Sequence, residues 1–181
     1  MNQGLIPSRY AKALYEFASE KGADKRVFDL MKTLSASFET EPQLMKVMAN
    51  PFVAPADKVK LLSTAAGVRQ DSDDVFARFL QLLTENNRLD LTRDIALAYL
   101  KQYRADHGIR LVTVTSAAPL DKADEERLKK IIAAHLDGDT MDYRSAVDPD
   151  LIGGFVVTID NEKLDASVAN ELKQLRLKLL N

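Results

Sequence analysis

Apolar residues recur at helical spacing through the first hundred residues of the chain. Large apolar side chains stand three and four positions apart, and a proline or a potential capping residue precedes most of these runs. Glycine or asparagine follows several of them, as is typical of helix C-termini. The pattern predicts six helices with short connections, and therefore a compact helical bundle. The predicted helices span residues 7–22, 24–39, 42–48, 55–67, 72–85 and 90–107.

The pattern changes near residues 105–109. Residues 109–116 read IRLVTVTS, a β-branched and partly alternating run that predicts a strand. Asp121 is the expected cap of an amphipathic helix that ends near Leu136, and Asp165 is the expected cap of a last helix. Residues 142–147 and 155–160 predict two further strands. We therefore predict an α+β protein of two domains, a six-helix bundle over residues 1–105 and a small α/β domain over residues 106–181.

The first predicted helix carries more apolar residues than burial against one neighbour requires. At 100° per residue, the apolar side chains between Tyr10 and Ala18 cover an arc of roughly 200°. Two explanations remain open: burial on two sides within the bundle, or contact of part of the arc with a partner helix. The fifth helix is similar over residues 76–83, and a groove between two such helices can hold an amphipathic peptide. The sixth helix is apolar nearly all round, which predicts a central position.

Composition narrows the possible functions. The net charge is −2, and lysine and arginine are interspersed with acidic residues, which argues against a general nucleic-acid binder. There is no cysteine, and the two histidines, His107 and His135, lack the spaced partners that a metal site needs. The Gly153-Gly154 pair fits no phosphate-loop motif and predicts a bend or a close backbone approach. We therefore predict no catalytic, cofactor-binding or metal-binding residue.

Four segments, in the same order along the chain, resemble one known family. The segments are RYAKALYEFA (9–18), ENNRLDL (85–91), VTVTSAAPLD (112–121) and VDPDLIGGFVVTIDNEKLDASVANELKQLRLKL (147–179). With these segments the sequence resembles the delta subunit of bacterial F-type ATP synthases, whose mitochondrial relative is the oligomycin-sensitivity-conferring protein. The resemblance covers essentially the whole chain, and its last segment is the most specific.

The resemblance implies a non-catalytic stator subunit without a cofactor, present in one copy per complex and monomeric when isolated. In this family the helical bundle grips the N-terminal helix of an alpha subunit in a groove between the first and fifth helices. The smaller domain meets the C-terminal ends of the b subunits of the peripheral stalk. The complex holds the subunit at the cytoplasmic face of the bacterial inner membrane, where the link keeps the head from turning with the rotor during proton-driven ATP synthesis.

Carried over residue by residue, the resemblance implies two partner-binding sets. The groove candidates are Tyr10, Ala13, Leu14, Ala18, Phe79, Leu82, Leu83 and Asn86. The stalk candidates are Leu172, Leu175, Leu179 and Leu180.

Two other classes of function remain as alternatives. A helical-bundle protein that binds RNA or regulates transcription has a similar fold, since fold does not fix function. The scattered charges argue against it. An enzyme needs a pocket with converging polar groups, and the sequence offers no candidate set.

Overall fold

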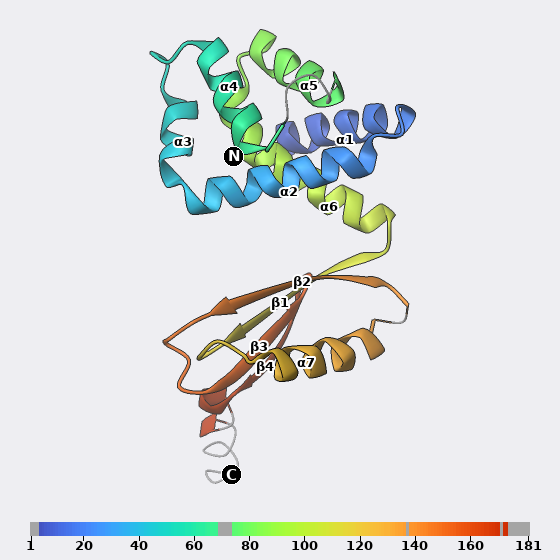
Figure 1. Ribbon diagram of the computed structural model, residues 1–181, viewed down its shortest axis with the longest axis vertical. Helices are drawn as coiled ribbons and strands as arrows, with labels where there is room; N and C mark the ends of the chain where they lie inside the picture. The colour runs from blue at the N-terminus through green and yellow to red at the C-terminus, as the bar shows by residue number, and fades with distance from the viewer. Residues whose placement is uncertain (1–3, 69–73, 137, 171, 174–181) are drawn as a thin grey trace. The chain divides into compact units, whose positions relative to one another are not determined.

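A computed structural model gives the fold and describes residues 4–68, 74–136, 138–170 and 172–173. The chain divides into two compact units, Met1–Tyr103 and Arg104–Asn181. The first unit is helical and the second contains a sheet with a helix, as Figure 1 shows. The predicted class, a helical bundle followed by a small α/β part, is confirmed. The division falls inside the sixth helix, two residues before the expected boundary.

The described residues of the first unit form five α-helices, most of a sixth and one short 3₁₀ turn, and two of these helices begin at a proline. Pro42 and Pro55 stand in the first turns of their helices, where the missing N–H is no loss. The predicted cap Ser72 lies outside the described residues. The elements are α1 (Leu5–Glu20), α2 (Asp24–Thr40), α3 (Pro42–Ala49), α4 (Pro55–Ala65), α5 (Asp74–Glu85), the 3₁₀ turn Leu89–Leu91 and α6 (Thr92–Asp106).

Aromatic side chains join α1, α2 and α6 in the core of the bundle. The Tyr99 hydroxyl donates a hydrogen bond of 3.0 Å to the main-chain carbonyl of Asp24. The Tyr15 ring meets Tyr99 edge-on at 5.9 Å between centroids, and Phe28 stacks on Tyr103 at 4.3 Å. Burial, with the charge of Asp24, raises the pKa of Tyr99, so the phenol stays neutral.

The sixth helix has a buried face and an exposed one. Ile95, Tyr99 and Leu100 are fully buried, whereas Leu97 is 40% exposed. The helix contributes a large part of the bundle core, as a central position requires, and Leu97 is an apolar residue on its exposed face. A single apolar residue at the surface is ordinary, and periodicity alone does not separate it from a core residue.

The second unit is a four-stranded sheet with a helix on one face. Its order is β2-β1-β3-β4, with β1 and β2 parallel and the other pairs antiparallel. Helix α7 begins at the expected cap, because the Asp121 carboxylate accepts the main-chain N–H of Asp124 at 2.8 Å. Ile132 and Leu136 pack on Val112, Val114 and Val157 of the sheet. The elements are β1 (Ile109–Ser116), α7 (Lys122–Ala134), β2 (Thr140–Val147), β3 (Gly154–Ile159) and β4 (Glu162–Ser167).

The segment around Asp165 differs from the prediction. Asp165 lies in strand β4, which the sequence did not reveal, and it does not cap the helix that follows. The Ser167 hydroxyl instead accepts the main-chain N–H of Asn170, and Asp165 accepts hydrogen bonds from both the hydroxyl and the N–H of Ser167. These bonds, the hydroxyl first, lower the pKa of Asp165. Asp165 therefore acts on the helix start through Ser167.

Gly154 marks a close approach of two strands, as the sequence predicted. Its φ is +78°, and a Cβ atom there would lie 2.4 Å from the main-chain oxygen of Ala166 on the paired strand β4. Only glycine fits both the conformation and the space.

A buried ion pair lies within the second unit. Arg104 donates two hydrogen bonds to one carboxylate oxygen of Asp142 on β2, the shorter at 2.7 Å. The two side chains are 10% and 9% exposed. Since a buried charge without its partner is unfavourable, loss of either side chain alone is expected to destabilise the unit.

Candidate functional site

An apolar groove lies between α1 and α5 in the first unit. These two helices are in contact, and Figure 1 shows them close together in the bundle. The groove has a volume of about 160 Å³. Its lining residues are Tyr10, Ala13, Leu14, Phe17, Arg78, Phe79 and Leu82.

The groove has a buried floor and an exposed rim. Leu14 and Phe79 are each 4% exposed and form its floor. Ala13 is exposed, and Leu82 is 43% exposed, so both can be covered further by a partner. Along the apolar arc of α1, Ala18 is buried and Tyr15 packs on Tyr99 of α6, whereas Tyr10, Ala13 and Phe17 line the groove.

Five of the eight groove candidates line this cavity, and three do not. Ala18 and Leu83 are fully buried inside the bundle, so their expected exposure to a partner is corrected. Both share a helical face with groove residues, yet other helices of the bundle cover them. Asn86 is exposed just after α5, where its side-chain amide donates to the Leu82 carbonyl at 2.8 Å. It therefore closes the end of the helix and is not among the lining residues.

Two lining residues, Phe17 and Arg78, were missed by sequence reasoning. Phe17 stands seven positions after Tyr10 and four after Ala13, so helical spacing alone places it on the same face. Arg78 stands one turn before Leu82 and donates to Asp74 at 3.0 Å between Nε and Oδ1. A search for apolar residues on one helical face does not find Arg78, because its side chain is charged.

The stalk candidates fall only partly within the described residues. Leu172 is 55% exposed on a helical stretch, while Leu175, Leu179 and Leu180 lie outside the described residues. Val168 is also exposed, one turn before Leu172. Its main-chain N–H donates to the Gly153 carbonyl, and the preceding Ile152 is 77% exposed. Ile152 was missed because it stands in a turn without periodicity.

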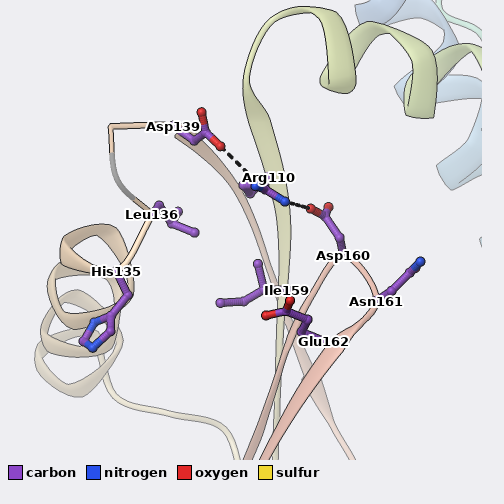
Figure 2. Close-up of a pocket in the computed structure, with 8 residues that line it drawn as sticks. All are labelled: Arg110, His135, Leu136, Asp139, Ile159, Asp160, Asn161 and Glu162. Atoms are coloured by element: carbon purple, nitrogen blue, oxygen red, sulfur yellow. Dashed lines mark hydrogen bonds and ion pairs between the residues drawn. The ribbon is translucent and has the colours of Figure 1, made fainter.

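A second cavity, of about 380 Å³, lies at one end of the sheet in the second unit. Figure 2 shows Arg110 held between Asp139 and Asp160, at 2.9 Å and 3.0 Å between nitrogen and carboxylate oxygen. These hydrogen bonds raise the pKa of Arg110, so the guanidinium keeps its charge. Asp160 also accepts the main-chain N–H of Leu111, and the group thereby ties the β3–β4 turn to β1. This geometry serves to fix loops.

The described residues offer little for chemistry at this cavity. The Nδ1 of His135 lies 2.8 Å from the Ile131 carbonyl, and Figure 2 shows the imidazole directed away from Arg110. Within the described ranges, no cluster of three or more histidine or acidic residues is placed to hold a metal ion. Nor does any helix in those ranges have the length and apolar character to cross a membrane.

Comparison with known proteins assigns the family. Residues 6–179 match the sequence profile of the family described as ATP synthase delta (OSCP) subunit. The chain belongs to this family. The match covers both units.

Individual relatives agree over the full length. The "ATP synthase subunit delta" of Bacteroides thetaiotaomicron is 37% identical over all of this chain and 97% of its own length. That of Parabacteroides distasonis is 38% identical over 99% of this chain and 98% of its own. A solved chain from the Toxoplasma gondii mitochondrial ATP synthase hexamer has a TM-score of 0.75 at 19% identity, covering 97% of this chain and 98% of that one. At that identity it supports the fold.

Proposed function

We propose that this delta-family protein is a non-catalytic stator subunit of an F-type ATP synthase, joining the catalytic head to the peripheral stalk. The observation that carries the proposal is the apolar groove between α1 and α5, together with membership of the family. In this role the first unit binds the N-terminal helix of an alpha subunit, and the second unit binds the C-terminal ends of the b subunits. The protein is then peripheral, held through the complex at the cytoplasmic face of the bacterial inner membrane.

The groove suits an amphipathic helix for physical reasons. Its floor is already formed in the free protein by Leu14 and Phe79, so little ordering of the receptor is needed on binding. Covering the exposed part of Leu82 and the ring of Tyr10 removes apolar surface from water. A helix that places an apolar stripe in such a groove is a common mode of peptide recognition.

The exposed apolar residues near the end of the second unit support a stalk contact there. Ile152, Val168 and Leu172 are exposed on two adjoining segments. Residues four apart on a helix lie on one face, so Val168 and Leu172 form one stripe. We expect Leu172→Asp to weaken capture of the soluble part of the b subunits in a pull-down. Leu164→Asp is the matched control, since Leu164 is exposed on β4 of the same unit.

A stator needs affinity and stiffness, and two contacts on one chain provide affinity efficiently. Once one unit is bound, the other meets its partner at a raised effective concentration. Two moderate contacts can therefore hold the head against the torque of the rotor.

Titration calorimetry of the full chain tests the groove directly. The probe is a synthetic peptide with the N-terminal sequence of the alpha subunit from the same organism, and mixed-sequence RNA serves as a comparison. We expect saturable one-to-one binding of the peptide and no binding of the RNA. A protein that is folded by circular dichroism and binds no peptide contradicts the proposed groove.

A further inference from the structure

We propose that the groove between α1 and α5 selects a partner helix that carries one large apolar side chain and a carboxylate one turn away from it. The guanidinium of Arg78 binds this carboxylate. This inference rests on the proposed function and names the chemistry of the partner at the same site. Two observations support it: the volume of the hollow within the groove, and the placement of positive charges around that hollow.

The hollow has room for one large side chain. Its volume of about 160 Å³ is close to that of a cavity of about 150 Å³ that holds a benzene molecule. Ala13, on the exposed rim of α1, contributes only a methyl group to the lining. One leucine- or phenylalanine-sized anchor fills this volume.

Arg78 is the charged member of an otherwise uncharged lining. Of the seven lining residues it alone carries a formal charge. Its bond to Asp74 joins two side chains that are 61% and 70% exposed, and such pairs contribute little. A guanidinium has five N–H donors, so it can bind a second carboxylate or exchange the first. The rim of the groove therefore presents an available cation.

A second positively charged side chain, Lys21, lies close to Phe17, one of the groove residues on α1. The Lys21 ammonium lies 6.0 Å from the centre of the Phe17 ring, and Phe17 lines the groove. Two positive groups around an apolar lining complement an apolar stripe flanked by acidic residues.

The spacing follows from helix geometry. Arg78 and Leu82 are four residues apart on α5, which is about 6 Å along the helix axis. A partner helix that runs along α5 therefore meets Arg78 and Leu82 one turn apart. The expected pattern on the partner is an acidic residue three or four positions from a large apolar one.

Binding of the alpha-subunit peptide to charge variants of the full chain tests the role of Arg78. We expect Arg78→Glu to weaken the peptide's affinity about tenfold and Arg78→Gln to weaken it less. A peptide with its acidic residues changed to lysine is expected to prefer the Arg78→Glu protein. The matched control is Lys12→Glu, since Lys12 forms a similar exposed i,i+4 pair with Glu16 on α1 and does not line the groove.

An Ala13→Leu variant tests whether the space in the groove is needed to accept a side chain of the partner. Leucine is nearly as good a helix former as alanine and fills the space with apolar atoms, so we expect unchanged or higher thermal stability together with at least tenfold weaker peptide binding. If the wild type binds the peptide but the Arg78 and Lys12 variants shift its affinity equally, or Ala13→Leu binds like wild type, this inference is wrong and the proposed function stands. A folded wild type that binds no peptide overturns both.

Discussion

Replacing Leu82 by aspartate is expected to weaken peptide binding while the bundle stays folded. Leu82 is 43% exposed, so less than half of its surface is left for a partner to cover. Full burial of a leucine is worth about 1.5–3 kcal/mol, and the exposed share therefore corresponds to about 0.6–1.3 kcal/mol of binding energy. A carboxylate facing an apolar helix adds a desolvation cost of at least about 1–3 kcal/mol, the range for an uncharged polar group without a partner. Together we expect a loss of at least about 1.6 kcal/mol, or about 15-fold in Kd.

The same substitution should leave the bundle folded. The share of Leu82 that is already buried contributes about 0.9–1.7 kcal/mol to folding, within the stability of an ordinary domain. Leu14→Asp differs, since Leu14 is 4% exposed and its carboxylate would be enclosed without a partner. We expect that change to unfold the bundle, so it cannot report on binding.

Titration calorimetry with the alpha-subunit peptide, accompanied by circular dichroism of each variant, measures the effect. Leu97→Asp is the matched control, because Leu97 on α6 is 40% exposed and does not line the groove. Equal losses of affinity in the Leu82 and Leu97 variants, with both proteins folded, would refute the assignment of the groove.

Three further predictions concern the second unit, and each is checked by denaturant or thermal unfolding. Gly154→Ala is expected to destabilise the β3–β4 pair by at least about 2 kcal/mol, because a Cβ at positive φ meets the Ala166 carbonyl; an unfolding midpoint equal to wild type would contradict this close approach. Asp142→Ala should cost about 3–5 kcal/mol by leaving Arg104 buried without its carboxylate, and less when Arg104 is also replaced by methionine. Asp165, whose pKa is lowered in the fold, contributes stability above its unfolded pKa of about 4 that disappears as the pH falls through its folded pKa. Asp165→Asn should therefore flatten the acid side of the stability profile, and an unchanged profile would argue against the bonds to Ser167.

The helices were predictable because local signals and tertiary packing agree. Pro42, Pro55 and Asp121 stand at helix starts, and the apolar period matches the buried faces. Strand β1 coincides with its prediction because its β-branched run suits a buried strand. Strand β4 was missed because the segment from Glu162 to Ser167 is an edge strand rich in polar residues, as edges tend to be.

The groove was predictable as a location but not in detail. Helical period places Leu14 and Ala18 of α1 on one face, but it does not say which part of that face other helices cover. The structure assigns Ala18 and Leu83 to the core and brings Arg78 to the rim. Such assignments depend on which helices are neighbours, which is a property of the whole bundle.

The central claim is that one chain joins two partners, and sedimentation of a three-part mixture tests it most directly. The parts are the catalytic head stripped of its delta-type subunit, the soluble part of the b subunits, and the full chain. We predict that head and b subunits sediment together only when the chain is present, with one copy in each complex. Separate sedimentation in its presence, or joint sedimentation in its absence, would contradict the account.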